Sequence, residues 1–521
     1  MFITTIIISF DQLIDGPAKT VWVRQGLPPD DIQNLRLTEA PDPSVNSSFK
    51  LGTAAQSAIG LSALAAAHFH FLQTGREEEV HVDARHAILE FNSEKYYTID
   101  GKVPEGQLFD ELSDIYKTKD GYVRLHTNFA HHKKGLLDIL QCEPTKSAVA
   151  VALADWSAEE FEAEVFRRHL CAAALRSFEA MDMTPHGIFQ VNINPVSITK
   201  IGDAPKRVLT DSGNVQFALE GIRVLDLTRV LAGPVCGRTL AAHGADVLLV
   251  TSPHLPSFPL LDMETSRGKR TTQLDLDVFR EAETLRELVR DADVFLQAYR
   301  PGGLAGRGFG PEDCAAIRPG IVHASLTAFS PGGPLEDVKS FDSLAEAYAD
   351  YIRATQGEEE ATKLPPYRAL PMQALDHAAG YLLAFGIAAA LCKTVTEGGS
   401  WRVRVSLSAT LLWIRRFGNI DPINAFGEGR PLPPRGVSLD PEVAAVSTTV
   451  EEDPGDDFVE KEGRERQEQG QGQGRGQGKG QGHRRTMTAI RHAATFTHLR
   501  IREGKAPMRL DAHKPEWLPR P

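Results

Sequence analysis

Two short turns combine basic side chains with glycine and could bind a phosphate. Residues 267–270 read Arg-Gly-Lys-Arg and residues 300–303 read Arg-Pro-Gly-Gly, and each turn lies beside the end of a predicted strand. Guanidinium and ammonium groups supply positive charge, while glycine lets the backbone approach a phosphate closely. Ligands of open α/β sheets gather beyond the carboxyl ends of the strands. Solvated surface charge is the competing interpretation, and composition alone does not separate the two.

One aspartate, Asp342, could act as a nucleophile. It stands in Ser-Phe-Asp-Ser-Leu-Ala at 340–345, after the glycine–proline turn at 331–334 and ahead of small apolar residues. One interpretation is a helix N-cap, which Asp fills well. The other is a carboxylate nucleophile at a helix start, partly removed from water and close to the thioester of a bound acyl group. The residues alone favour the cap.

Other motifs of catalysis or binding are missing from the sequence. The loop after the strand near residue 225 is not G-x-G-x-x-G, and neither a G-x-S-x-G elbow nor a Walker-type loop occurs. His126, His131 and His132 have no Cys or carboxylate at metal-ligand spacing, so we interpret them as solvated loop histidines and expect no metal site. Asp376 and His377 begin an alanine-rich helix and are expected to cap it.

The segment 221–250 predicts the unit that positions the basic turns. An apolar strand near 222–225 is followed by Ala232, Gly233 and Pro234, a turn whose proline suits a helix start. A helix then ends at Gly244, and 245–250 is apolar again, which makes a βαβ unit. Strands and helices continue to alternate to residue 330. This pattern predicts a Rossmann-like, doubly wound parallel sheet of the α/β class.

The chain before this unit predicts mixed elements and a second, smaller α+β domain. Asp120 and Gly121 separate two strand-like runs, the strongest short hairpin signal in the chain. Further elements are predicted as helices at 54–73 and 84–97, a strand at 80–83, an amphipathic helical region at 156–181 and a linker at 195–205.

Segments 55–91 and 378–414 share one layout, which predicts an internal duplication. Each has a small-residue helix, then Gly75 or Gly398, then a Val-x-Val strand and a second helix, without gaps. Chance similarity of alanine-rich helices is the alternative. Because the two copies are several hundred residues apart, they indicate a domain duplication rather than a solenoid.

Composition excludes several classes of protein. The 521 residues are 42% hydrophobic, so the chain can bury a large core and form at least two domains. The formal net charge of −12 argues against a general nucleic-acid binder. Five scattered cysteines without a C-x-x-C pair fit a reduced compartment. No apolar run suggests a membrane span, and the apolar residues 2–10 are expected to form a strand or the start of a truncated chain.

With these motifs in place, the chain resembles the family III CoA-transferases, the group of formyl-CoA and carnitine CoA-transferases and α-methylacyl-CoA racemases. The resemblance rests on five motifs in the family's order over about 120 residues. They are VLDLTRVLAGPVCGRTLAAHGADVLLV, SRGKRTTQLDLD, ADVFLQAYRPGGLAGRGFGPEDCA, PGIVHASLTAFSPGGP and SFDSLAEA. The whole chain resembles a long subgroup with duplicated halves, in which residues 50–190 look like the second half of the fold placed ahead of the first.

The resemblance implies a function and a set of site residues. Asp342 stands where the family has its catalytic aspartate, which attacks an acyl-CoA thioester, forms an acyl-aspartyl anhydride and releases CoA thiolate. A second carboxylic acid then takes over the acyl or CoA group. The implied neighbours of coenzyme A are Arg267, Lys269, Arg300, Gly302, Ala232, Gly233 and Pro234.

Two alternative functions remain. Racemisation of an α-methylacyl-CoA is the first, although Phe341 stands where racemases carry histidine. The second is a non-catalytic CoA-binding relative, because Ser340 and Asp350 replace family glycines. The favoured expectation is an enzyme of the transferase class that acts on an acyl-CoA and a small carboxylic acid, with no nucleic acid, membrane or metal.

The expected organisation follows the resemblance. The family's interlocked two-chain fold predicts either a homodimer or a pseudo-dimeric single chain, and the location is expected to be intracellular, with the cytoplasm favoured and mitochondria or peroxisomes as alternatives. The segments are an N-terminal extension (1–50), a second-half-like segment (51–200), the core with the CoA-binding sheet and catalytic Asp (216–420), a low-complexity linker expected to be disordered (430–485) and a C-terminal segment (486–521).

Overall fold

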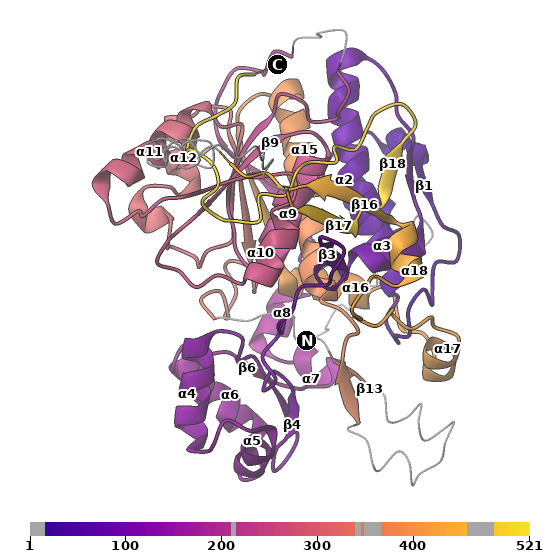
Figure 1. Cartoon of the computed structure of the whole chain (residues 1–521), viewed down its shortest axis with the longest axis vertical. Helices are drawn as coiled ribbons and strands as arrows, with labels where there is room; N and C mark the ends of the chain where they lie inside the picture. Colours follow the sequence, from indigo (N-terminus) through magenta and orange to yellow (C-terminus); the bar gives the residue numbers. More distant parts are fainter. Residues whose placement is uncertain (1–15, 210–214, 339–344, 348–365, 456–483, 521) are drawn as a thin grey trace, which may run out of the picture.

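A computed structural model describes residues 16–209, 215–338, 345–347, 366–455 and 484–520 (Figure 1). Its largest sheet has seven strands, and six of them run parallel. The three strands β8, β9 and β11 carry short apolar runs, as expected for strands buried on both faces, whereas β10 is polar. In spatial order the strands are β10 (Arg270–Gln273), β9 (Asp246–Thr251), β8 (Arg223–Leu227), β11 (Val294–Gln297), β12 (Val322–Thr327), β15 (Ser400–Ser406) and β7 (Val196–Gly202).

The predicted linker at 195–205 is wrong, because most of it forms the edge strand β7. It pairs antiparallel with β15, Val196 opposite Val405 and Ile198 opposite Val403. The strand supplies few buried side chains of its own, and its partner lies about two hundred residues further along the chain. Pairing over that separation leaves no local signal.

Helices cover both faces of this sheet, which confirms the α/β layer. Alternate residues of β8 face opposite sides: Val224 belongs to the core under α9 (Ala232–Ala242) and α15 (Ala374–Thr396), and Leu225 to the core under α11 (Phe279–Asp291). The helix α12 (Pro311–Ile317) packs on the α11 side, where Cys314 is buried.

The helix α15 packs along a second long helix, α2 (Leu51–Thr74), and both are buried over most of their length (Figure 1). Alanine and glycine dominate both helices, which lets the two backbones approach closely. By length and composition α15 is able to cross a membrane, yet nearly all of its apolar window is buried inside the protein. In this structure it is a core helix.

The layout of the proposed repeat is present in both copies. After α2 comes Gly75 with φ +71°, then β2 (Val80–Val82) and α3 (Ala84–Glu90); after α15 comes Gly398 with φ +72°, then β15 and α16 (Leu407–Arg415). The strands β2 and β15 lie in different sheets. A duplication in the history of the chain remains a prediction.

A smaller α+β unit lies below the main body in Figure 1. Its strands β4 (Ile115–Lys117) and β5 (Tyr122–Leu125) form the predicted hairpin. The predicted helical region 156–181 is wrong between α6 (Ala158–Arg167) and α7 (Phe178–Asp182), because β6 (Ala172–Ala174) pairs with β5 there. One separate core joins this sheet to the helices α4 (Ala130–Leu140), α5 (Lys146–Leu153) and α6.

The C-terminal strands pair with N-terminal ones. The strand β17 (Thr486–Ile490) joins β16 (Ser447–Glu451) to β3 (Tyr97–Ile99), and β18 (Ala494–Phe496) pairs with β2. The helix predicted at 84–97 therefore ends at Glu90, since β3 starts at Tyr97. The remaining elements are short: α1 (Gly16–Arg24), η2 (Pro29–Asn34), β1 (Leu35–Leu37), η3 (Ser93–Lys95), α7 (Phe178–Asp182), α8 (Pro185–Gln190), α10 (Pro259–Thr265), η4 (Ala305–Arg307), β13 (Ala345–Ala347), β14 (Tyr367–Ala369), α17 (Pro422–Gly427) and α18 (Pro441–Ala445).

Four of the five expected segments, all except 51–200, contain residues outside the described part. Residues 1–15 include the apolar N-terminal run, and residues 456–483 include the glutamine–glycine tract. Within the segment 430–485, α18 and β16 are described.

Candidate functional site

The strand order reverses between β8 and β11, which creates a crevice at their carboxyl ends. From β8 the chain moves outward to β9 and β10, then returns to the other side of β8 as β11. The loops that leave β8 and β11, residues 228–231 and 298–304, therefore start side by side. Crevices at such a reversal are the usual ligand sites of open α/β sheets.

Ala232, Gly233 and Pro234 form the first turn of α9 at this crevice, which confirms the predicted helix start. A Cβ on Gly233 would lie 2.6 Å from the Cβ of Thr228 and 3.1 Å from that of Ala298. Only glycine therefore lets the two loops and the helix meet. The free N–H groups and the dipole of a helix N-terminus favour a negative charge at this place.

Lys269 is fully buried, and its ammonium ties β8 to α9. Nζ lies 2.8 Å from Oδ2 of Asp226 and donates to the carbonyl oxygen of Pro234 at 2.9 Å. The other Asp226 oxygen accepts a hydrogen bond of 2.6 Å from Thr228 Oγ1. A Cβ on Gly237 would lie 2.1 Å from Oδ2 of Asp226. The glycine therefore lets the backbone of α9 lie directly against the ion pair. In this structure Lys269 holds the first turn of α9 in place.

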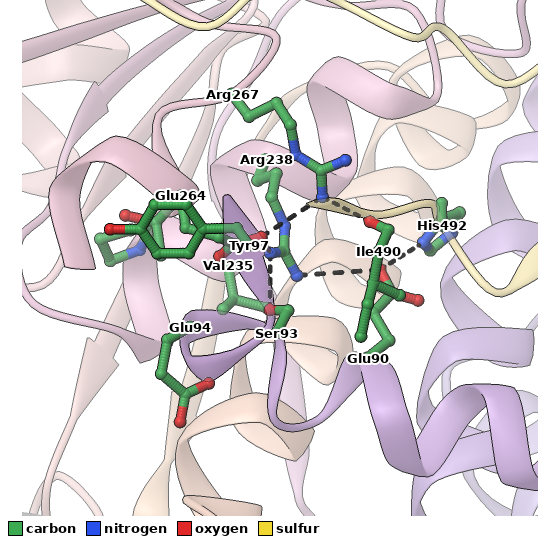
Figure 2. A network of polar contacts seen from close by, with 12 residues as sticks. Glu90, Ser93, Glu94, Tyr97, Val235, Arg238, Glu264, Arg267, Ile490 and His492 are labelled. Atoms are coloured by element: carbon green, nitrogen blue, oxygen red, sulfur yellow. Dashed lines mark hydrogen bonds and ion pairs between the residues drawn. The ribbon is translucent and has the colours of Figure 1, made fainter. Parts of the chain in front are cut away.

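Arg267 is also buried and has partners within the protein (Figure 2). Its Nη2 donates to the carbonyl oxygen of Ile490 at 2.7 Å and lies 3.3 Å from Oε1 of Glu264. The next residue, Gly268, has φ +79° and donates its N–H to the carbonyl oxygen of Lys505. The C-terminal segment therefore covers the basic turn 267–270.

Arg238 lies at the centre of the buried network in Figure 2. It donates to Glu264 and lies 3.7 Å from Oε1 of Glu90. Glu90 in turn pairs with His492 at 3.0 Å. Burial opposes the charge of Glu90, but the cations around it hold the pKa of this carboxyl well below its usual range. This network joins α3, α9, α10 and the C-terminal segment, and sequence motifs did not single it out.

Arg300 differs from the other two predicted phosphate ligands because its side chain is exposed. It follows β11 in a turn where Gly302 has φ +78°, a left-handed conformation that glycine adopts readily. Its guanidinium makes no hydrogen bond or ion pair with another residue in the described ranges. The preceding Tyr299 is partly buried, and desolvation raises the pKa of its phenol. Of the three basic residues, Arg300 alone presents a cation at the crevice without first giving up a protein partner.

A further group of residues at the ends of β8 and β9 was missed by the sequence motifs. Arg229 donates to the carbonyl oxygen of Pro256, and its guanidinium lies 6.0 Å from the ring centre of Phe129. Phe129 also contacts Phe258 edge to face at 4.8 Å, so the smaller α+β unit reaches the crevice here. Arg229, Phe258 and Asp262 line one small cavity at this place. Desolvation raises the pKa of Asp262 to about 6. Arg229 stands inside the family motif at 224–250, which was the available signal.

The proposed catalytic residue Asp342 lies outside the described residues, as do Ser340, Phe341 and Asp350. The described chain runs from β12 through the turn at 331–334 to Val338 and resumes at Ala345. The turn follows the carboxyl end of β12, on the same edge of the sheet as the crevice.

The other predicted side chains take structural positions. His132 is buried in α4 and His126 is partly buried, so the interpretation as solvated histidines is wrong for these two and fits only the exposed His131. Burial lowers the pKa of His126 to about 3. Asp376 lies inside the first turn of α15 rather than at its cap, which is Gln373, and His377 pairs with Glu94 at 3.0 Å. In the part of the chain that the structure describes, no group of His, Cys, Asp and Glu is arranged to hold a metal ion.

Comparison with known proteins agrees with the motifs. The sequence model of CoA-transferase family III matches residues 219–437. Among curated proteins, the Formyl-CoA:oxalate CoA-transferase of Rhodopseudomonas palustris is 32% identical over 236 residues, which cover 41% of this chain and 54% of the relative. The "Probable fatty acyl-CoA transferase Rv3272" of Mycobacterium tuberculosis is 31% identical over 209 residues, 38% of this chain and 52% of the relative.

The matches are partial in both directions. The acetyl-coenzyme A transferase nodX of Hypoxylon pulicicidum is 32% identical over 39% of this chain and 35% of its own length. Among solved structures, Rv3272 aligns with TM-score 0.32 over 38% of this chain and 57% of its own. A CAIB/BAIF family protein from Brucella suis aligns with TM-score 0.33 at 24% identity over 45% of this chain and 64% of its own. The chain spans about half the length of the first two curated relatives. Residues 219–437, which contain the switch-point crevice, are thus similar to CoA-transferase family III.

Proposed function

We propose that this protein transfers coenzyme A between an acyl-CoA and a small carboxylic acid, with Asp342 as the nucleophile. The observation that carries the proposal is the family match over 219–437, a segment that holds both the crevice between β8 and β11 and Asp342. The Rhodopseudomonas palustris relative is named as a formyl-CoA:oxalate CoA-transferase. The Mycobacterium tuberculosis relative is named as a probable fatty acyl-CoA transferase.

In the proposed reaction, a carboxylate oxygen of Asp342 attacks the thioester carbonyl carbon. A carbon–oxygen bond forms, the carbon–sulfur bond breaks, and CoA leaves as a thiolate with the electron pair. The product on the protein is an acyl-aspartyl anhydride. The carboxylate of the second acid then attacks the acyl carbonyl carbon of this anhydride, which forms a mixed anhydride of the two acids and releases the free carboxylate of Asp342. The CoA thiolate attacks the carbonyl carbon of the second acid, which forms the new thioester and releases the first acid as its carboxylate.

The predicted CoA ligands contribute to this proposal in different ways. Arg300, Gly302 and the first turn of α9 present positive charge and backbone N–H groups at the crevice. Lys269 holds the first turn of α9 in position, because its ammonium donates a hydrogen bond to the carbonyl oxygen of Pro234. For Lys269 or Arg267 to bind a phosphate directly, the side chain has to exchange its present protein partners.

The experiment is mass spectrometry of the full chain after incubation with mixed acyl-CoAs, with and without hydroxylamine. The expected result is an acyl or hydroxamate adduct on Asp342 in the wild-type protein and none in Asp342→Ala. Asp337→Ala is the matched control, because Asp337 is exposed in the same connection between β12 and β13. Release of CoA by Asp342→Ala at the wild-type rate would refute the role of Asp342 as the nucleophile.

Two other outcomes identify the alternative functions. Deuterium exchange at the α-carbon of a branched acyl-CoA, without thioester cleavage, indicates racemisation. Tight CoA binding with no turnover on any acyl-CoA and acid indicates a non-catalytic relative.

We also propose that one chain supplies two equivalent halves of the fold and works inside the cell. The packing of α2 against α15 supports the first part, since these are the equivalent helices of the repeat. The cysteines support the second part, since they form no disulfide within the part of the chain that the structure describes. A monomeric mass in light scattering is expected for a pseudo-dimeric chain, and a dimeric mass contradicts it.

A further inference from the structure

A cavity of about 350 Å³ opens at the carboxyl ends of β12 and β15. Its wall combines the end of α1, the residues that lead into β7, the turn after β12 and the start of α16. These elements lie beyond β11 in the sheet, so the cavity is separate from the crevice between β8 and β11. Its volume lies at the lower end of the range of small-molecule pockets, roughly 300–1,000 Å³.

Arg404 supplies the first positive charge of this cavity. It is a half-buried residue of β15, and its register places it opposite Ser197 on β7 and Ser325 on β12. Its guanidinium makes no hydrogen bond or ion pair with another residue within the described ranges. A partly desolvated arginine without a partner is costly, and a bound anion would offset that cost.

Arg24 supplies the second charge, from the last position of α1. Its guanidinium donates to the side-chain oxygen of Asn194, which also lines the cavity, and its other N–H groups make no bond that the structure describes. Two guanidinium groups thus line one small space, whereas no carboxylate among the described residues does.

The charged groups around the cavity do not neutralise the positive charge of Arg404 and Arg24. Arg402, on the same face of β15, is turned to Glu312 at 3.7 Å. Glu336 attracts Arg404, but one of its carboxylate oxygens already accepts the N–H of Gly332 at 2.9 Å. Arg416 lies near Arg24 and adds to the positive field.

Hydroxyl groups and aliphatic side chains complete the wall. Ser330 and Ser406 are both buried and lie 2.8 Å apart through their Oγ atoms, and Gln190 donates to Ser330 at 3.0 Å. Ile193 and Val405 line the cavity beside them. A polar side with two arginines and an apolar side suit a short organic acid. The glycine-rich loop and lysine typical of a polyphosphate site are absent from this lining.

We propose that this cavity is a binding site for the carboxylate group of a small organic acid. Arg404 and Arg24 hold the carboxylate, since the planar guanidinium matches it with two parallel hydrogen bonds. The serines and the aliphatic side chains contact the rest of the molecule. The inference rests on the cavity and its charges and does not depend on CoA transfer at Asp342.

The test is isothermal titration calorimetry of the full chain with oxalate, succinate, inorganic phosphate and free CoA as separate probes. We expect one of the two dicarboxylates to bind more tightly than phosphate, and Arg404→Gln to weaken it about ten-fold or more. Arg24→Gln, on an exposed side chain, is expected to weaken it as well and guards against a folding defect in the first variant. Arg402→Gln is the matched control and keeps the wild-type affinity within about two-fold.

The outcomes separate this proposal from the proposed function. Asp342→Ala is expected to bind the dicarboxylate as the wild type does, whether or not it has lost CoA transfer. Phosphate binding more tightly than both dicarboxylates overturns the carboxylate proposal. Equal dicarboxylate affinity in the wild type, Arg404→Gln and Arg24→Gln overturns the site itself, as does displacement of the bound acid by free CoA.

Discussion

Replacing Lys269 by methionine separates a structural role of this lysine from direct binding of a phosphate. The side chains of Lys269 and Asp226 are both 0% exposed, and their charged atoms lie 2.8 Å apart. Methionine keeps the length of the side chain but leaves Asp226 as an unpaired carboxylate inside the protein. Removal of one partner from a buried ion pair costs about 3–5 kcal/mol of unfolding free energy.

The assay is urea unfolding at neutral pH, with the midpoint and the slope fitted for each variant. We expect Lys269→Met to lower the unfolding free energy by about 3–5 kcal/mol, and Lys269→Met/Asp226→Asn to recover at least about 1 kcal/mol, because neutral Asn needs no counter-charge. The loss of unfolding free energy in the double variant is then smaller than the sum of the two single losses, which is not seen for two independent sites. A loss below about 1 kcal/mol in the single variant would refute the structural role.

The matched control is Arg300→Met, because Arg300 is exposed and has no partner among the described residues. Its unfolding free energy is expected to stay within about 0.5 kcal/mol of the wild type. If Arg300 holds a CoA phosphate, its affinity for CoA falls, and the fall is larger at low salt because screening is weaker there. Lys269→Met losing CoA affinity at unchanged stability would instead support direct phosphate binding by Lys269.

Two further predictions concern packing and pH. Gly237→Ala is expected to destabilise the protein by about 1–3 kcal/mol in urea unfolding, since the added Cβ meets Asp226 Oδ2 at 2.1 Å, whereas Gly306→Ala, with no atom within 4 Å, is expected to be near neutral. For Asp262, the folded pKa of about 6 lies above the ordinary value of 3.8, so protonation favours the folded state: its stabilising contribution is complete below pH 4 and is lost as pH rises through 6. Asp262→Asn is expected to remove about 1–3 kcal/mol of pH dependence between pH 4 and 6, and an unchanged pH–stability profile contradicts the burial of this carboxyl.

Several parts of the fold were predictable because their signals are local. The strand, helix and strand at 221–250, the hairpin at Asp120 and Gly121, and the glycines that end α2 and α15 all follow from residues within one or two turns of each other. The motifs around Ala232, Arg267 and Arg300 were also readable in sequence, since they sit at strand ends in a fixed order. The hydrogen-bond and ion-pair partners of these side chains were not predictable from the sequence.

The elements that sequence reasoning missed depend on distant parts of the chain. The strand β7 forms because β15 pairs with it. The helix α3 ends at Glu90 rather than at Tyr97, because the residues from Tyr97 onward pair with β17 as the strand β3. The strand β6 interrupts an amphipathic, helix-like pattern because β5 offers an open edge. Local propensity is a weak preference that such pairing overrides.

The sequence alone was enough to predict the parallel α/β layer, the similarity of residues 219–437 to CoA-transferase family III and the order in which the basic turns follow the strands. Only the tertiary structure decided that Lys269 and Arg267 are buried with partners while Arg300 is exposed, and that Arg24 and Arg404 share one cavity. The physical reason is that a charge's role depends on what lies within a few ångströms of it. Those neighbours, from Asp226 beside Lys269 to Ile490 beside Arg267, come from segments that the chain brings together only when it folds.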